Sequence, residues 1–420
     1  MSDFARSFLT LLFNAAVGAA DPAKIVAANL PSRPRGRTVV VGAGKGAAQL
    51  ARAFEDLWDG PLDGTVVTRY GHGVACERIE VIEAGHPVPD ASGLAAAARL
   101  IQRVAGLGPD DLVVALICGG GSALLPAPPP GFTLDDEVGL GKALLASGAP
   151  IAAMNTIRKH FSRIKGGRLA AAAHPAKVVS LIVSDIPGDD PAQVASGPTV
   201  PDGSTPEDAL ALADCYRIGL PTPVRAYLAG AVADGPMPGA DGFARDEARV
   251  IASAANSLEA AAAAARQRGV DAAILSDAVE GEAREVAKVH AALAREVALR
   301  GRPFARPVVL LSGGETTVTV TGAGRGGRNT EFLLSLAAGI DGIAGISALA
   351  ADTDGVDGTQ DNAGAFADGT TVARLRAAGL DPRALLANND AWTAFHALGD
   401  LFVPGPTGTN VNDLRAILIR

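Results

Sequence analysis

Short apolar segments alternate with alanine-rich segments along almost the whole chain. This alternation is typical of parallel sheets whose faces are covered by helices, so we predict an α/β fold. With 420 residues, of which 48% are hydrophobic, the chain is long enough for two domains with separate cores. We predict that the first domain is a Rossmann-like parallel sheet with helices on both faces. Its expected strands are residues 38–41, 64–68, 112–117 and 178–183.

Proline and glycine gather between residues 201 and 245, and we place the linker between the domains there. The predicted domains are residues 1–240 and residues 241–420, and the second is also expected to be α/β. Residues 314–322 alternate apolar and polar side chains, which predicts a half-exposed strand next to residues 308–311. The other elements expected in the second domain are strands at 250–252, 272–275 and 307–311 and helices at 258–267 and 282–298.

The charge and cysteine content exclude several classes of function. A formal net charge of −8 and a pI near 5.3, with no basic patch in the sequence, argue against a nucleic-acid partner. Three scattered cysteines make neither a disulfide framework nor a zinc site and suit a reducing cytoplasm. We therefore expect a cytoplasmic protein with small-molecule substrates, no nucleic acid and no membrane, with a homodimer left open.

The first 20 residues are apolar enough to resemble a signal peptide. However, Phe4, Phe8, Leu11, Leu12 and Ala15 recur at helical spacing, and this periodicity favours an amphipathic helix that docks on the protein.

The segment "VVVGAGKGAAQLA", residues 39–51, follows the first strand and has two interpretations. Gly42, Gly44 and Ala47 fit a dinucleotide-binding turn, but no acidic residue for the ribose stands about 20 positions further on. Lys45 within the turn instead suggests a mobile positive charge beside a helix N-terminus, which suits a polyphosphate. A solvated lysine is the alternative to that functional role.

Three consecutive glycines in "ICGGGSALLPAP" follow another buried strand. Glycine allows close backbone approach, and successive N–H groups bind phosphate or carboxylate, so we predict a ligand loop at Gly119, Gly120, Gly121 and Ser122. In open α/β sheets ligands lie beyond the carboxyl ends of the strands, and Gly42, Gly119 and Asp185 are therefore expected to converge.

Asp185, Asp189 and Asp190 stand together in "SDIPGDDPAQVASGPTVPD" after an apolar strand. Carboxylates at such a position are metal ligands or bases in phosphoryl transfer, whereas turn formation around Pro187 and Gly188 is the structural alternative. In "MNTIRKHFSRIKGGRLA" we expect one helix that ends at Gly166 and Gly167. Its Arg158 and Lys165 would share a face and could border an anion.

The second half carries Glu315 after a glycine pair and two arginines, Arg325 and Arg328, in a glycine-rich loop. Such arginines suit planar oxyanions. A later segment resembles a calcium loop only superficially, with acidic residues at Asp352, Asp354, Asp357 and Asp361. An acidic loop that lies beside a magnesium ion, or one with a purely structural role, is the better interpretation. Neither a Walker A sequence nor the protein-kinase motifs are present, and no serine triad is supported.

Eight collinear segments carry a family resemblance. They are "GAGKGAA", "AGHPVPD", "CGGGSALL", "MNTIRKHFSRIKGGRLA", "SDIPGDDPAQVASGPTVPD", "SGGETTVTV", "GRGGRNTEF" and "DTDGVDGTQDNAG". The sequence resembles the class II, MOFRL-containing glycerate 2-kinases, whose members are also labelled hydroxypyruvate reductase. The resemblance implies ATP-dependent phosphorylation of D-glycerate to 2-phosphoglycerate with a divalent metal, Mg²⁺, and an active site in the cleft between two α/β domains.

The resemblance also implies roles for single residues. The family's catalytic lysine and an arginine needed for its activity correspond to Lys45 and Arg328. Asp189 is our own choice of residue to orient or deprotonate the C2 hydroxyl. We assign Gly44, Gly119, Gly120, Gly121, Ser122, Gly313, Gly314 and Glu315 to ATP binding, and Asp185 and Asp190 to the metal.

Two other functions stay open from the sequence. The glycine turn would also fit an NAD(P)H-dependent hydroxypyruvate reductase, although the missing ribose-binding acid argues against it. A non-catalytic sensor of nucleotides or sugar acids is the second alternative.

Overall fold

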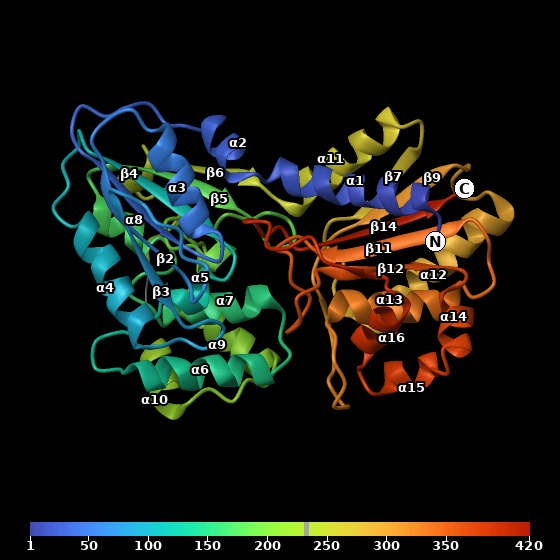
Figure 1. Ribbon diagram of the computed structural model, residues 1–420. Helices are drawn as coiled ribbons and strands as arrows, with labels where there is room; N and C mark the ends of the chain where they lie inside the picture. The colour runs from blue at the N-terminus through green and yellow to red at the C-terminus, as the bar shows by residue number, and fades with distance from the viewer. Residues whose placement is uncertain (231–234) are drawn as a thin grey trace. The chain divides into compact units, whose positions relative to one another are not determined.

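The computed structural model describes residues 1–230 and 235–420 and divides into two compact units. The first unit is Pro22–Ile251, and the second joins Met1–Asp21 to Ala252–Arg420 (Figure 1). This division differs from the predicted one at residue 240, because the N-terminal segment belongs with the C-terminal half. Residues 231–234, which fall within the predicted linker, lie outside the described residues.

The first unit is built on a six-stranded sheet with the order β3-β2-β1-β4-β5-β6. Neighbouring strands from β3 through β5 all pair in parallel. The strand order reverses between β1 and β4, and ligands bind at such a switch point in doubly wound folds. The strands are β1 (Thr38–Ala43), β2 (Asp63–Arg69), β3 (Ile79–Ala84), β4 (Leu112–Cys118), β5 (Lys177–Val183) and β6 (Glu247–Ala252).

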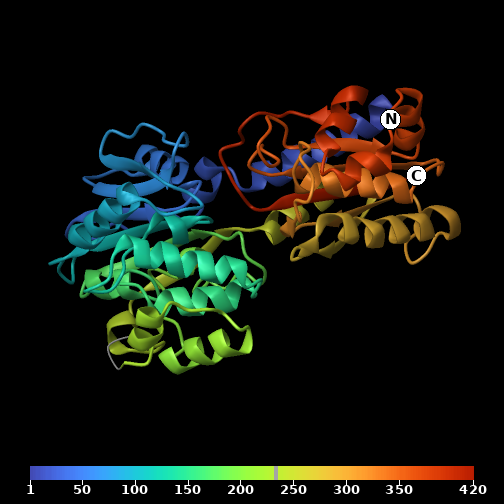
Figure 2. The same cartoon turned by 90° about the horizontal axis from the view of Figure 1, so that it is seen from below.

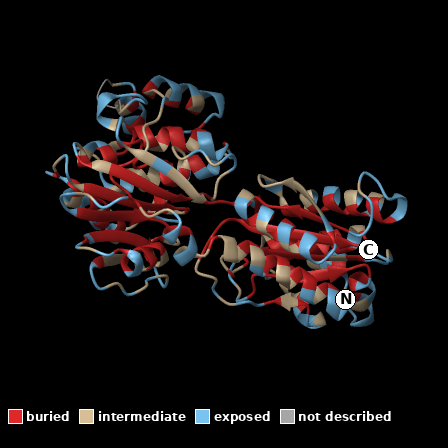
Figure 3. Ribbon diagram, turned by 90° about the horizontal axis from the view of Figure 1, so that it is seen from above, coloured by how far each residue is buried: buried red, intermediate tan, exposed pale blue. Residues whose placement is uncertain are grey.

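Helices cover both faces of this sheet, as predicted. Val39, Val41 and Ala43 pack with α4 (Ala91–Val104) and α8 (Arg168–Ala173), whereas α3 (Ala47–Leu57) lies against β1, β2 and β4. Successive side chains of a strand point to opposite faces, so strands covered on both faces read as continuous apolar runs. Strands β1, β2, β4 and β5 are buried along most of their length, and Figure 3 shows such strands in red. The remaining helices before α6 are α2 (Pro22–Ala27) and the single turn α5 (Gly121–Leu124).

The segment predicted as a linker is folded into the first unit where the structure describes it. Leu140, Leu144, Ala209 and Val224 share one buried apolar cluster. Proline and glycine at 201–245 therefore mark turns around short helices rather than a domain boundary. The helices of this cluster are α6 (Leu134–Ala146), α7 (Ile151–His160), α9 (Pro206–Cys215) and α10 (Thr222–Leu228).

The second unit has a mixed six-stranded sheet with the order β13-β12-β11-β14-β9-β7. Strands β7 and β9 pair in parallel, and the pairings from β13 through β9 are antiparallel. Its strands are β7 (Asp271–Ser276), β9 (Val308–Ser312), β11 (Ile346–Asp352), β12 (Gly364–Asp368), β13 (Leu401–Phe402) and β14 (Asp413–Ile419). Its helices after α1 are α11 (Ala254–Gln267), α12 (Ala283–Arg300), α13 (Arg328–Gly339), α14 (Thr371–Ala377), α15 (Pro382–Ala387) and α16 (Ala391–Leu398).

Two strand predictions need correction. Residues 250–252 were expected to open the second domain, but β6 pairs with β5 in the sheet of the first unit. Of residues 314–322, only β10 (Thr316–Thr317) is a strand, and it pairs with β8 (Gly281–Glu282) rather than with β9. Beyond β10 the backbone donates hydrogen bonds to side chains and not to a neighbouring strand. The Thr319 N–H, for example, donates to the Glu282 carboxylate at 3.1 Å.

The N-terminal helix α1 (Asp3–Ala19) is amphipathic, as predicted. Its Phe8, Leu9, Leu12 and Phe13 are buried with α11 and with β9, β11 and β14 of the second unit. Figures 1 and 2 both show this blue helix beside the orange and red elements. By length and composition alone the helical segment Asp3–Ala27 could cross a membrane, a criterion that buried helices of folded proteins also meet. The helix is interrupted at Ala20, and a second helix, α2, begins at Pro22.

We expect Leu12→Ala to destabilise the second unit by about 2–5 kcal/mol, because the side chain is fully buried and its removal leaves a cavity. The measurement is urea unfolding followed by Trp392 fluorescence in a Trp58→Phe background, since these are the two tryptophans and they lie in different units. Leu11→Ala, on the half-buried side of the same helix, is the matched control. Equal losses for both variants would contradict the docking of this face.

Candidate functional site

The turn after β1 and the loop after β4 touch through their backbones. The N–H of Lys45 donates to the carbonyl of Gly119 at 2.8 Å. Gly44 has a φ of 136°, and a Cβ there would overlap the Cys118 carbonyl. The sequence prediction that the strand ends converge is met here, and glycine is required at Gly44 by this close approach.

Asp185, which follows β5, lies against the same loop. A Cβ on Gly119 would overlap the Asp185 carboxylate, and one on Gly121 would come within 2.6 Å of the Ala195 Cβ. The three glycines therefore let the backbone pass between a carboxylate and a neighbouring turn. Gly119 and Asp185 are brought together as expected from the ends of their strands, whereas Gly42 lies within β1 opposite Leu116, and it is the following turn that meets Gly119.

Lys45 is half-buried, and among the residues that the structure describes no carboxylate pairs with its ammonium. Its positive charge is close enough to His86 to act on that imidazole. Burial, together with the nearby cations of Lys45 and Arg69 and the imidazole of His72, lowers the pKa of His86 to about 4. His86 is consequently neutral at pH 7. Sequence analysis did not single it out, although it lies in "AGHPVPD".

Burial raises the pKa of Cys118 to about 12, so this thiol beside the glycine turn is neutral. It receives a contact from the Gly46 N–H at 3.3 Å. Because thiolates rather than thiols are nucleophiles, Cys118 fills space at the site instead of reacting.

A chain of hydrogen bonds holds Ser122 at the start of α5. Ser122 and Ser196 are 2.7 Å apart at their hydroxyl oxygens, and Ser196 donates to Oδ1 of Asn155 at 3.2 Å. Since Ser196 has one hydrogen and gives it to Asn155, Ser122 is the donor to Ser196. Ala195 and Ser196 have φ values of 52° and 59°, a conformation that costs energy for residues other than glycine. Sequence analysis missed Asn155 and Ser196, which only tertiary structure brings to the loop.

The two remaining aspartates of the "SDIPGDD" segment differ in their surroundings. Asp189 is half-buried with a φ of 53°. Asp190 is exposed, and its carboxylate accepts a hydrogen bond from the Ala192 N–H at 3.0 Å. This hydrogen bond of Asp190 stabilises a turn, which is the structural role that the sequence left open for these aspartates.

The predicted pairing of Arg158 with Lys165 on one helix face is wrong. Helix α7 ends at His160, and Lys165 is buried, donating to the Leu125 carbonyl at 2.8 Å and to Glu137 at 2.9 Å. Arg158 donates to Oδ1 of Asn155 at 3.0 Å. Lys165 is therefore a structural cation, and only Arg158 of the pair lies beside the Ser122 hydrogen-bond chain.

Arg328 is the first residue of α13 in the second unit and sits among three carboxylates. Its guanidinium contacts Asp413 at 2.9 Å, Glu315 at 2.8 Å and Asp352 at 2.7 Å. Burial acts to lower the pKa of Arg328, but Asp413, Asp352 and Glu315 outweigh it and raise the pKa. Burial likewise raises the pKa of Asp352 well above its usual value. Glu315 is 47% exposed, whereas Asp413 is fully buried.

Arg415 and Asp413 anchor this cluster, and sequence analysis missed both. Arg415 is fully buried and donates to Asp413 at 2.7 Å and to the Gly313 carbonyl at 3.2 Å. A Cβ at Gly314, whose φ is 104°, would overlap the backbone of Val279. Gly314, one of the two glycines predicted to bind ATP, is thus required by packing within its own unit.

The other candidates of the second half serve local structure. Asp357 accepts from the N–H groups of Asn329 and Thr330 at 3.0 and 2.9 Å and so caps α13. The Asp352 carboxylate accepts from its own turn at the Asp354 N–H. Arg325 lies over the ring of Trp392, with 4.1 Å between the guanidinium carbon and the ring centroid, rather than beside Arg328.

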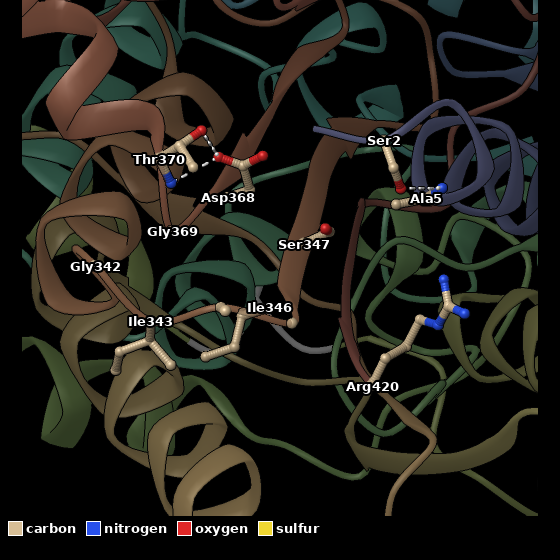
Figure 4. Close-up of a pocket in the computed structure, with 12 residues that line it drawn as sticks. Ser2, Ala5, Gly342, Ile343, Ile346, Ser347, Asp368, Gly369, Thr370 and Arg420 are labelled. Atoms are coloured by element: carbon tan, nitrogen blue, oxygen red, sulfur yellow. Dashed lines mark hydrogen bonds between the residues drawn. The ribbon is translucent and has the colours of Figure 1, made fainter.

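Among the described residues, no group of three or more His, Cys, Asp or Glu side chains is arranged to hold a metal ion. One cavity of the second unit, of about 500 Å³, lies between the loop at 342–345, the start of β11, Asp368 and Arg420 (Figure 4). None of the predicted site residues lines that cavity.

The lowered pKa of His86 predicts a pH effect on the first unit. Between pH 6.5 and 4 the unfolded chain binds a proton at His86 that the folded chain does not, so stability falls as the pH falls through this window. We expect the loss between pH 8 and pH 5 to be about 2 kcal/mol smaller for His86→Gln than for the parent. Urea unfolding followed by Trp58 fluorescence in a Trp392→Phe background measures it, and identical losses would refute the buried neutral imidazole.

The chain matches known families along most of its length. A family described as "Domain of unknown function (DUF4147)" matches residues 8–229, and the MOFRL family matches residues 308–413. A protein of Agrobacterium vitis that carries hydroxypyruvate reductase as a provisional name is 55% identical over 99% of this chain and 94% of its own length. A D-glycerate 2-kinase of Thermotoga maritima is 40% identical over 94% of this chain and 93% of its own length.

A solved structure agrees with these sequence relatives. The crystal structure of a glycerate kinase from Thermotoga maritima has a TM-score of 0.89 and 38% identity, and the match covers 99% of this chain and 100% of that one. Similarity of this extent in both sequence and fold shows that the chain belongs to the glycerate 2-kinase family.

Proposed function

We propose that this protein phosphorylates the C2 hydroxyl of D-glycerate with ATP and releases 2-phospho-D-glycerate. The observation that carries the proposal is the half-buried ammonium of Lys45, which has no carboxylate partner among the described residues and follows a glycine turn at the switch point of the sheet. An unpaired cation at this position needs an anion, and the phosphates of ATP supply one. The family's relatives named as glycerate kinases support the choice of acceptor.

The loop at Gly119, Gly120 and Gly121 binds the phosphates in this proposal. Its glycines leave the backbone N–H groups open to a ligand, as in other anion-binding nests. The hydroxyl hydrogen of Ser122 is given to Ser196, so Ser122 fixes the loop and its backbone N–H serves the ligand. Lys45 neutralises the charge that develops on the transferring phosphoryl group.

Asp189 takes the role of orienting or deprotonating the C2 hydroxyl. It is held with a positive φ directly after Gly188, in the loop that begins with Asp185. Backbone strain of this kind persists where the surrounding structure holds a residue in place, and such residues gather at functional sites.

Mg²⁺ bound with ATP would be held by one or two carboxylates and by the phosphates themselves. Asp185 fits this donor set because its carboxylate lies against the phosphate-binding glycine loop. The assignment of Asp190 stays a prediction, since its carboxylate already accepts from Ala192. When bound, the ion would shield the negative charge of the phosphates.

Arg328 is proposed to bind an oxyanion of a substrate. Asp413 and Asp352 are buried and orient the guanidinium, whereas Glu315 is half-exposed. A substrate oxyanion would replace Glu315, because exchanging an exposed carboxylate costs less than removing a buried one. Glu315 in this view occupies the exposed side of the guanidinium until substrate arrives.

The activity test uses the full chain with ATP, Mg²⁺ and D-glycerate. We expect ADP to form only when glycerate is present, and phosphorus and proton NMR to place the phosphate on C2. In a parallel assay hydroxypyruvate and NADPH should give no oxidation of the nucleotide, because β2 ends at Arg69 without the acidic residue that binds a ribose. NADPH oxidation without ADP formation would replace this proposal with the reductase.

We expect Lys45→Met to lose about 10²-fold or more in kcat while the fold is kept, because the ammonium acts on charge that develops in the transition state. Steady-state kinetics with circular dichroism of the same sample provides the measurement. Lys142→Met removes an exposed lysine of α6 and serves as the control. Near-normal turnover in a folded Lys45→Met protein would mean that Lys45 is a solvated lysine without a catalytic role.

The two neighbouring aspartates allow a second test. Asp189→Asn should lower kcat by about 10²-fold, as expected for loss of a general base, while Asp190→Asn should change kcat little. Comparing the two variants in one kinetic series separates chemistry from turn formation, since both remove a charge from the same loop. Small and equal losses would mean that the loop is structural.

A further inference from the structure

A second cavity, of about 540 Å³, lies in the first unit away from Lys45. Leu112 and Lys177 line it, and these residues begin β4 and β5, whereas Gly119 and Asp185 follow the ends of the same strands. A strand of seven residues spans about 20 Å, so the cavity and the glycine loop lie at opposite ends of the sheet. The cavity therefore belongs to neither the phosphate loop nor the Lys45 turn.

The lining of this cavity is basic in a chain whose net charge is −8. Three acidic residues also line it, and two of these are already engaged. Glu247 pairs with Lys177 and Arg249, and Asp111 accepts from the N–H groups of Gly108 and Arg37. The basic residues of the lining are Arg33, Arg35, Lys177, Arg245 and Arg249, and the third acid is Asp110.

Two of the arginines have no carboxylate partner among the residues that the structure describes. Arg245 donates only to the carbonyls of Pro109 and Pro175, each at 3.0 Å, and no ion pair involves Arg35. Arg33 pairs with Asp59 at 3.3 Å, and that aspartate is fully exposed. Guanidinium groups bind phosphate through parallel N–H donors, so these residues have unused capacity for an oxyanion.

The arginine segment is fixed to the sheet before any ligand arrives. In "SRPRGR", residues 32–37, the N–H of Gly36 donates to the Asp110 carbonyl at 2.8 Å, and a Cβ at Gly36 would overlap the Asp111 carboxylate. Leu112 in turn donates its N–H to the Arg37 carbonyl at 2.9 Å. Pro34 restricts the backbone between Arg33 and Arg35. Because the segment is already ordered, binding there costs little conformational entropy.

We propose that this cavity, named here the basal arginine cavity, binds a small organic phosphate separate from the substrates at the glycine loop. Its volume lies within the range of small-molecule sites, roughly 300–1,000 Å³. The excess of guanidinium over free carboxylate selects an anion, and the planar donors of Arg35 and Arg245 favour a phosphate over a single carboxylate. A ligand bearing two phosphoryl groups would satisfy both arginines.

The test titrates inorganic pyrophosphate into the full-length Lys45→Met protein by calorimetry, so that the cation beside the glycine loop is absent and any binding there is weakened. We expect one saturable site, and Arg35→Gln with Arg245→Gln should weaken it by about tenfold or more, as loss of charge-assisted hydrogen bonds requires. Arg35→Gln alone should weaken binding severalfold and keep the fold, because this exposed side chain makes no ion pair among the described residues.

The matched control removes two positive charges elsewhere, with Lys142→Gln on α6 and Arg383→Gln on α15, both exposed. Pyrophosphate affinity should stay within about twofold in that control, which separates a specific site from general attraction to positive charge. No saturable binding, or equal weakening in the control and the arginine variants, would overturn the proposal. The titration involves no turnover, so its outcome is independent of the proposed phosphorylation of glycerate.

Discussion

The contact between the β1 turn and the β4 loop is the constraint on which the site of the first unit depends. The Lys45 N–H reaches the Gly119 carbonyl because Gly44 places no Cβ against Cys118, while Gly119 leaves room for the Asp185 carboxylate. This backbone bond fixes where the Lys45 side chain starts and where the glycine loop turns. The neutral His86 and Cys118 beside it add no competing charge, so the ammonium keeps its full effect on an anion.

In the second unit, the guanidinium of Arg328 is held among carboxylates. A guanidinium enclosed by carboxylates needs partners that cannot leave, and burial of Asp413 between Arg328 and Arg415 provides one. Removing Arg328 would leave the buried carboxylate of Asp352 without an ion-pair partner among the described residues, which costs far more than losing an exposed pair. Exposure is graded across the cluster, from the fully buried Asp413 to the half-exposed Glu315. The fixed side orients the group, and the exposed side can exchange its partner.

Local sequence patterns predicted the local features well. Strands β1, β2, β4 and β5 fall where apolar runs end in glycine, arginine or aspartate, and the periodicity of α1 identified a docking helix. Features set by tertiary contacts were not accessible. The membership of β6 in the first sheet depends on its partner β5, and Asp413 meets Arg328 across 85 residues of chain. The end of α7 at His160 was missed because basic residues continue past it without a change in composition.

The discontinuous second unit constrains how the chain can be assembled. Helix α1 is made first, but its buried face rests on α11 and on β14, a strand inside the sheet that is made last. The whole of Pro22–Ile251 is synthesised between these partners, so that unit can fold while α1 still lacks its core. Closing so long a loop delays the second unit's core until synthesis is complete. The apolar stripe of α1 is therefore exposed longest in the newly made chain, and it is the segment for which a chaperone would have the most time.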